Sequence, residues 1–221
     1  MAFSPRDTSH LADVGRSVPS GKALRVKLRP LTFMRKVFLL IACLVASNGL
    51  FAQESDKDKA GIWLDVPFVK QTVEGCGSAS IAMLLQYWSA HGTQIAPERE
   101  DADAIQKQLY SRKGHGIYAS DLERYLRDTG FRVFALRGAW SDLREHLSKG
   151  RPLILSIEPG GSHAPLHYVV ATGMDWQREA VFVNDPARGK LLRIERAEFE
   201  KEWQATKNYL LLAVPASAPS E

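Results

Sequence analysis

The sequence feature that most constrains this chain is a cysteine at the start of an apolar helical pattern. Gly75 and Gly77 flank Cys76 and leave the backbone around it unrestricted. Four apolar residues then recur at the i, i+3, i+4, i+7 spacing of one helix face: Ile81, Leu84, Leu85 and Trp88. First-turn amides of a helix lack intrahelical partners and carry partial positive charge, so they stabilise a thiolate placed there. The pattern predicts a helix from Cys76 to about Ala90 with a nucleophilic thiol in its first turn; the alternative is a small cysteine that only packs in the core.

The charge of the chain is unevenly distributed. Its 221 residues carry a formal net charge of +4, a value that alone could indicate an anionic partner such as nucleic acid. Residues 1–52 hold eight basic and two acidic side chains, a net charge of +6, whereas residues 53–221 hold 21 basic and 23 acidic ones, a net charge of −2. We therefore expect no nucleic-acid partner. The hydrophobic content of 45% suffices for one domain with a sizeable core.

The basic first segment has the composition of an export signal. Its positive charges precede an apolar run at 37–46, and small and polar residues follow that run. We expect residues 1–33 to be a disordered extension and residues 34–52 a signal peptide, so that the domain is exported to the periplasm or secreted. Two alternatives stay open: residues 37–52 form an uncleaved membrane anchor, or the chain is a lipoprotein with its lipid on Cys43.

The number and the positions of the cysteines also indicate that one thiol has a chemical role. Cys43 and Cys76 are the two cysteines of the sequence, and Cys43 lies in the expected leader. The exported domain would hold one thiol, which cannot form an internal disulfide and cannot alone build a zinc site. An unpaired thiol outside the cytoplasm is exposed to oxidation, so its retention suggests a chemical role. We expect no metal and no cofactor.

Helical patterns come first in the domain and strand patterns second. After a linker at 53–61, the expected elements are an extended segment at 62–69, helices at 76–90, 97–110 and 120–127, a strand at 131–135, a helix at 141–147, strands at 152–157, 166–174, 180–183 and 190–194, a helix at 198–203 and a strand at 209–214. Ser120 and Glu123 have the spacing of a capping box. Residues 62–214 should form one α+β domain, a helical half packed on an antiparallel β-sheet, before a disordered tail at 215–221.

A thiol nucleophile needs a base for its proton and a third group that holds the base in the right tautomer. His167 opens an apolar strand and would be fixed by the sheet, unlike the other histidines, which lie before the leader, in glycine-bounded breaks, on a helix surface or in a loop: His10, His91, His115, His146 and His163. Asp185 ends the next strand, from which a carboxylate can reach His167. Asn184 is adjacent, but successive strand residues point to opposite faces, so only one of the two can address His167. Taken alone, each residue also has a purely structural explanation: His167 could be a core histidine and Asp185 could initiate a turn.

Three motifs stand in order along the domain: Gln71-Thr-Val-Glu-Gly-Cys76-Gly-Ser-Ala-Ser-Ile-Ala-Met, His167-Tyr-Val-Val-Ala-Thr-Gly and Val183-Asn-Asp185-Pro-Ala-Arg-Gly189. Together they resemble cysteine-peptidase family thirty-nine, the papain-like fold of the bacteriocin-leader (double-glycine) peptidases, over about residues 62–214. The resemblance implies that Cys76 is the nucleophile, His167 the general base and Asp185 the group that orients the imidazole. It also implies that Gln71 is the side-chain donor of the oxyanion hole.

The sequence departs from the family pattern in several respects. Gln71 lies five residues before Cys76, one fewer than in the best-known leader peptidases, and Gly75 stands where an acidic residue is usual. Those peptidases are amino-terminal domains of ABC exporters, whereas this sequence has no Gly-x-x-x-x-Gly-Lys-Ser/Thr phosphate loop and no bundle of membrane spans. We therefore expect no ATP binding, and the resemblance does not identify the substrate.

The leading interpretation is an exported cysteine peptidase with a peptide or protein substrate. One alternative is a non-catalytic peptide-binding or scaffold domain of the same fold. Another is a transglutaminase-like acyl transferase, which uses the same order of Cys, His and Asp. A binding module needs no complete set of nucleophile, base, orienting carboxylate and oxyanion donor, which favours the enzyme.

Overall fold

The computed structural model describes residues 60–160 and 166–216. The elements of these residues are β1 (Gly61–Trp63), α2 (Cys76–Ala90), η1 (Pro97–Arg99), α3 (Ala102–Leu109), α4 (Ala119–Asp128), β2 (Phe131–Arg137), α5 (Trp140–Ser148), β3 (Leu153–Ile157), β4 (His167–Asp175), β5 (Ala180–Asp185), β6 (Gly189–Glu195), α6 (Arg196–Gln204) and β7 (Tyr209–Pro215). The predictions for the extension, the signal peptide and its alternatives, most of the linker and most of the tail lie outside the described residues.

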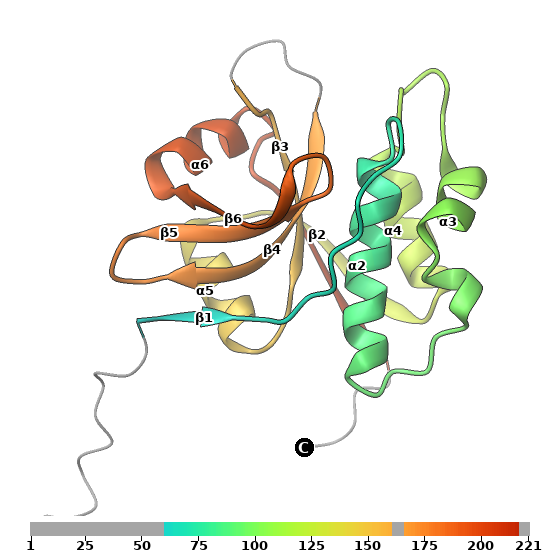
Figure 1. Ribbon diagram of the computed structural model, residues 1–221, viewed down its shortest axis with the longest axis horizontal. Coiled ribbons are helices and arrows are strands. Elements are labelled where there is room, and N and C mark those ends of the chain that lie inside the picture. The colour runs from blue at the N-terminus through green and yellow to red at the C-terminus, as the bar shows by residue number, and fades with distance from the viewer. Residues whose placement is uncertain (1–59, 161–165, 217–221) are drawn as a thin grey trace, which may run out of the picture. The chain divides into compact units, whose positions relative to one another are not determined.

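The seven strands form one antiparallel sheet (Figure 1). Six of them follow the order β2-β7-β3-β4-β5-β6, and β1 pairs with the last part of β4. The first half of β4 pairs with β3, so that His167 faces Ile157 across the ladder. On its other side β4 pairs with β5, which brings Asn184 opposite Val170 near the same end of the sheet. This sheet and its five α-helices confirm the predicted α+β class.

The helices form two groups around the sheet. In Figure 1, α2, α3 and α4 gather to one side of the strands and form the expected helical half. The helices α5 and α6 contact each other away from that group, with the ring centroids of Trp140 and Phe199 6.1 Å apart.

Burial of α2 fixes the position of its first turn. The helix runs from Cys76 to Ala90 as predicted, and Ile81, Leu84 and Leu85 are fully buried. Each such side chain stabilises the fold by about 1.5–3 kcal/mol relative to an exposed one. Because most of α2 is buried in the core, the position of its first residue, Cys76, is fixed relative to the sheet.

The helix expected from Pro97 is interrupted. A 3-10 turn covers Pro97–Arg99, and α3 begins only at Ala102. Asp101 causes the break, because its extended backbone and its side chain, which accepts the Ala104 N–H at 2.8 Å, make it a helix N-cap. The prediction of one continuous helix was therefore wrong.

The capping box expected at Ser120 is also absent. The helix α4 begins one residue earlier, at Ala119, and Tyr118 occupies the N-cap position without a side-chain cap. Glu123, which should have completed the box, instead pairs with Arg127 one turn later at 3.0 Å.

Residues 64–75 form neither a helix nor a strand, although the extended segment was expected to reach residue 69. We call this segment the strap. Its first residue, Leu64, donates its N–H to the Thr172 carbonyl at 2.7 Å, and Gln71 donates its N–H to the Pro186 carbonyl at 3.0 Å. The strap is thus held to the sheet before it enters α2.

Candidate active site

Cys76 is the first residue of α2, as predicted. The glycine before it is buried, and a Cβ there would lie 2.9 Å from Thr72 Oγ1 and 3.2 Å from the Thr72 backbone N and O, so a larger residue at position 75 would require Thr72 to shift. Burial of the thiol would raise its pKa, but a hydrogen bond with His167 and the backbone N–H groups of Tyr168 and Gly77 outweigh that effect and lower the pKa of Cys76. The thiolate is therefore favoured mainly by His167, with the amide of Gly77 in the first turn of α2 as a smaller contribution.

His167 is the first residue of β4 and is almost covered, with 13% of its side chain exposed. Its Nε2 lies 2.7 Å from Asp185 Oδ1, which leaves Nδ1 for the thiol. Burial would lower the pKa of His167, but the hydrogen bonds with Asp185 and then Cys76 raise it to about 9. A thiolate and an imidazolium are thus the favoured pair of protonation states.

Asp185 ends β5 and is 1% exposed. Besides His167, its Oδ1 accepts the backbone N–H groups of Ala187 at 2.9 Å and Arg188 at 3.2 Å, so the turn after the strand fixes the carboxylate. Burial would raise the pKa of this carboxyl, but the His167 hydrogen bond and charge lower it. The group remains anionic beside the imidazole.

Asn184 is fully buried and makes no hydrogen bond to His167. Its Nδ2 donates to the Val66 carbonyl at 3.1 Å, and its Oδ1 accepts the N–H of Leu191 at 3.0 Å. The two neighbours therefore divide their tasks: Asp185 contacts the histidine, and Asn184 ties the strap to β5 and β6.

Gln71 lies in the strap and lines the same cleft as Cys76. Its backbone is held by Pro186, directly after the aspartate that binds His167. Its Oε1 is buried but has no hydrogen-bond partner among the described residues, so no protein group there holds this end of the amide. The structure thus brings together all four residues singled out in the sequence: Gln71, Cys76, His167 and Asp185.

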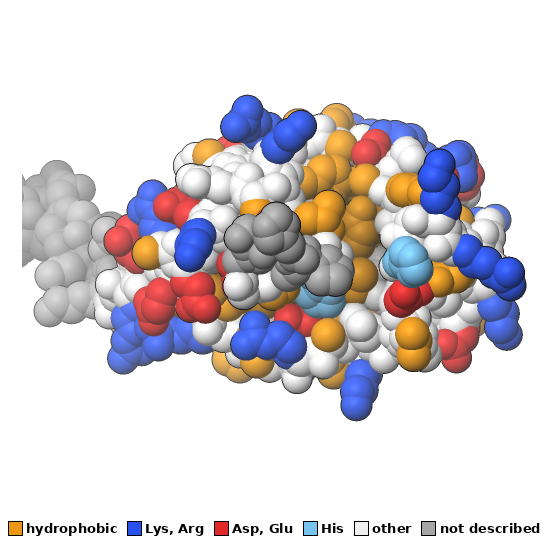
Figure 2. Space-filling model, turned by 90° about the horizontal axis from the view of Figure 1, so that it is seen from above, with side chains coloured by type: hydrophobic (Ala, Val, Ile, Leu, Met, Phe, Trp, Pro, Cys, Tyr) orange, Lys and Arg blue, Asp and Glu red, His pale blue; other side chains and the backbone are white. Residues whose placement is uncertain are grey.

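The cleft around these residues has a volume of about 680 Å³. Glu74 and His115 line its helical side, whereas the sheet side is lined by Pro159, Leu166, Ala187 and Arg188. Figure 2 shows this face of the molecule, with a hollow lined by hydrophobic side chains and histidine and acidic side chains next to it. The cleft thus combines an apolar surface with several polar and charged side chains, as ligand-binding sites commonly do.

Glu74 is not among the site residues predicted from the sequence, and His115 was predicted only to lie in a chain break. The two side chains form a pair in the cleft wall, with His115 Nδ1 3.0 Å from Glu74 Oε1. The single available signal was that Glu74 lies two residues before the cysteine. His91 and His146 do not line this cleft, and His10 and His163 lie outside the described residues.

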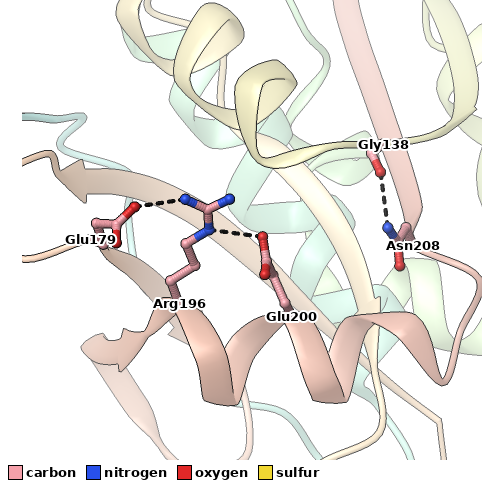
Figure 3. A network of polar contacts seen from close by, with 5 residues as sticks. All are labelled: Gly138, Glu179, Arg196, Glu200 and Asn208. Atoms are coloured by element: carbon pink, nitrogen blue, oxygen red, sulfur yellow. Dashed lines mark hydrogen bonds and ion pairs between the residues drawn. The ribbon is translucent and has the colours of Figure 1, made fainter.

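A second hollow of about 590 Å³ lies between α5 and α6. Its central Arg196 pairs with Glu179 at 2.6 Å and with Glu200 at 2.9 Å, while Asn208 donates to the Gly138 carbonyl at 3.1 Å (Figure 3). Both carboxylates are engaged by the same arginine, which indicates a structural network. Across residues 60–160 and 166–216, no group of three or more His, Cys, Asp or Glu side chains is placed to hold a metal ion.

The fold and the site together define a papain-like cysteine peptidase architecture. The model of the Peptidase C39 like family matches residues 63–211, and the chain belongs to this family. The family predicted from the three motifs is therefore confirmed. No curated protein sequence matches the chain.

Solved structures share the fold at low sequence identity. A protein from Bacillus anthracis assigned as a C39-like peptidase is 20% identical, with a TM-score of 0.58 over 72% of this chain and 99% of that one. A double glycine motif protease from an AMS/PCAT transporter, in complex with the leader peptide, is 22% identical, with a TM-score of 0.51 over 69% and 94%. The peptidase domain of Streptococcus ComA, a bifunctional ABC transporter of a quorum sensing pathway, is 19% identical, with a TM-score of 0.51 over 66% and 96%. In this chain, no helix of the described residues is long and apolar enough to cross a membrane.

Proposed function

We propose that this chain is an exported cysteine peptidase that hydrolyses peptide bonds with Cys76 as nucleophile and His167 as general base and acid. Asp185 holds the imidazole, and Gln71 donates to the oxyanion. The observation that carries the proposal is the series of hydrogen bonds from the Cys76 thiol through His167 to the buried Asp185, at the floor of an open cleft.

The proposed reaction begins with the sulfur anionic and the imidazole protonated. Cys76 Sγ attacks the carbonyl carbon of the scissile amide and forms a C–S bond, and the carbonyl oxygen takes the negative charge. The imidazolium of His167 then gives its proton to the leaving amine as the C–N bond breaks. Water, deprotonated by the neutral imidazole, attacks the thioester, and the C–S bond breaks to restore the thiolate.

Two donors can stabilise the oxyanion in this scheme. The Cys76 backbone N–H belongs to the first turn of α2, where amides have no intrahelical acceptor. The second donor is the side-chain amide of Gln71, which lies in the strap and lines the same cleft as Cys76. Donors fixed in advance at this position stabilise the developing charge without reorganisation.

The structural neighbours support a peptide as the substrate class, since one of them is a protease in complex with a leader peptide. A scaffold domain of this fold would need neither a stabilised thiolate nor an imidazole oriented by a buried carboxylate. A transglutaminase-like transferase would share both features and differ in the acceptor, an amine in place of water.

The test uses the full chain and three readouts. Alkylation of Cys76 by iodoacetamide, followed by mass spectrometry across pH, measures the reactivity of the thiol. Cleavage of a mixed peptide library measures hydrolysis, and amine incorporation measures transfer. We expect hydrolysis that is abolished in Cys76→Ala and His167→Ala while circular dichroism shows both variants folded. An ordinary thiol with no cleavage would overturn the proposal, and amine incorporation without hydrolysis would favour the transferase.

A further inference from the structure

The rim of the cleft on the helical side carries a preorganised carboxylate. Glu74 lies two residues before Cys76, and its side chain is 34% exposed. One of its oxygens accepts the hydroxyl of Tyr110, and the other lies 3.0 Å from His115 Nδ1. Both partners come from a part of the chain more than 30 residues away, so tertiary structure fixes the carboxylate in place.

The backbone of this pair is held in an unfavourable conformation. Glu74 has φ +56° and His115 has φ +48°, both in the left-handed region that side chains with a Cβ rarely occupy. Glycine or asparagine would adopt either conformation at lower cost. Such backbone strain persists where the surrounding structure over-determines it, and of the six described non-glycine residues with positive φ these two line the cleft. What glutamate adds at position 74, relative to glycine, is its carboxylate.

The charges of the cleft differ between its two walls. The hydrogen bond from Tyr110 and then that from His115 lower the pKa of Glu74, so the helical rim carries a carboxylate at neutral pH. On the sheet side, Arg188 is exposed and forms no ion pair with a described residue. A substrate side chain that approaches the helical rim therefore meets a negative charge whose oxygens have room for a further donor.

We propose that Glu74 is a specificity-determining residue that selects a lysine or arginine at one of the two residues on the acyl side of the bond that is cleaved. This inference rests on the proposed peptidase function and names a substrate class for the same cleft. A charge-assisted hydrogen bond to a fixed carboxylate is stronger than one to a neutral acceptor. A glutamine side chain at position 74 could accept from His115 through its Oε1 and donate to the Tyr110 hydroxyl through its Nε2, so the charge can be removed with the rim kept.

The experiment measures how fast matched tripeptidyl chloromethyl ketones alkylate Cys76 in the full chain. The probes carry Lys, Gln, Glu or Gly at one of two positions, the residue adjacent to the chloromethyl ketone or the residue before it. Each alkylation rate is divided by the rate at which iodoacetamide alkylates the same protein, which corrects for differences in thiol reactivity. At one of the two positions we expect Lys to react roughly 10-fold faster than Gln, and Glu slower than both. In Glu74→Gln the Lys and Gln rates should become equal within about twofold, whereas in Glu145→Gln, a matched loss of charge on α5, the preference should persist.

Three results would overturn the inference: equal Lys and Gln rates in the native chain, a Lys preference that persists in Glu74→Gln, or a Gly probe that outpaces the Lys probe. Binding of the corresponding peptide amides to the Cys76→Ala chain reports the same Lys-to-Gln ratio without any chemistry. A failure of the proposed function would instead appear as absent hydrolysis with an ordinary thiol, while this binding ratio still decides the role of Glu74.

Discussion

The imidazole of His167 and the carboxylate of Asp185 are joined by a hydrogen bond of 2.7 Å, and the same carboxylate oxygen accepts two backbone N–H groups of the following turn. The turn holds the aspartate, and the aspartate holds the histidine. Because Nε2 is engaged in this way, the ring can present only Nδ1 to Cys76. The strand ends thus define both the tautomer and the direction of the base.

Replacing the carboxylate by an amide tests this relationship. Asp185→Asn should lower kcat by roughly 10²-fold or more and leave KM within a few-fold, because an amide can orient the ring in the wrong tautomer and does not stabilise the imidazolium. Steady-state kinetics on a cleaved library peptide measure both constants. Asp65→Asn, an exposed carboxylate in the strap, serves as the control and should keep its turnover. Unchanged turnover in Asp185→Asn would require another third residue.

The pH dependence follows from the two shifted pKa values. The pKa of Cys76 is lowered and that of His167 is raised to about 9, so the thiolate–imidazolium form is populated between them. Below this window the sulfur is protonated, and above about pH 9 the imidazolium loses the proton that the leaving amine needs. We therefore expect a bell-shaped kcat/KM profile whose alkaline limb falls near pH 9.

Alkylation separates the two limbs, because it needs the thiolate and not the imidazolium. Its rate should rise with a midpoint below the ordinary thiol value of about 8.5 and should not fall above pH 9. In His167→Ala the midpoint should move upward, since the hydrogen bond and charge that lower it are lost. A midpoint at or above about 8.5 in the native chain would contradict the ion pair.

Loss of the oxyanion donor should affect the transition state alone. Gln71→Ala should lower kcat by roughly 10²–10³-fold while the iodoacetamide rate of Cys76 stays within about twofold, because the glutamine stabilises charge that is absent in the resting enzyme. Turnover and the alkylation rate of Cys76 are measured on the same preparation of each variant. Gln204→Ala on α6 serves as the control. A variant that loses both properties together would indicate a collapsed strap instead.

The expected export signal leads to a prediction that is independent of the site. Basic residues precede the apolar run at 37–46, and the charge reverses after it. We expect the protein recovered from cells to begin near Gln53 and to lie outside the cytoplasm, as mass spectrometry of fractionated cells would show. An intact Met1 or Met34 end in the cytosol would contradict this, while a membrane-bound form with a lipid on Cys43 would favour the lipoprotein.

Part of the site geometry could be predicted because it depends on local patterns, whereas the place of Gln71 was expected only from the family resemblance. The start of α2 at Cys76 follows from its apolar spacing, and the alternation of strand residues required that only one of Asn184 and Asp185 face His167. The break before α3 could not be predicted with the same ease, since Pro97 and Asp101 are both good helix starts and the chain uses the later one for its α-helix.

The pair of side chains in the cleft wall could not be predicted from the sequence for a different reason. Contact between Glu74 and His115 spans 41 positions and depends on how a loop folds back over the start of α2. No periodicity encodes such a pair, and a single histidine between two glycines looks like a turn. The role of Asn184 was likewise hidden, because its partner Val66 is 118 residues away.

That contact between Asn184 and Val66 yields the last prediction. Asn184→Ala leaves the buried Val66 carbonyl and the partly buried Leu191 N–H without these partners, and a buried unsatisfied group costs about 1–3 kcal/mol, so the free energy of unfolding in urea should fall by at least about that amount. The strap carries Gln71, so kcat should also fall, while alkylation of Cys76 should keep its pH midpoint because the His167–Asp185 bond is untouched.

Asn208→Ala is the matched control for this prediction. Asn208 also donates its side-chain amide to a distant backbone carbonyl, that of Gly138, but it lines the hollow between α5 and α6 and not the cleft (Figure 3). Its loss should lower stability and leave kcat unchanged. If Asn184→Ala instead raised the alkylation midpoint as His167→Ala does, Asn184 would act on the base, and the division of tasks between Asn184 and Asp185 would be wrong.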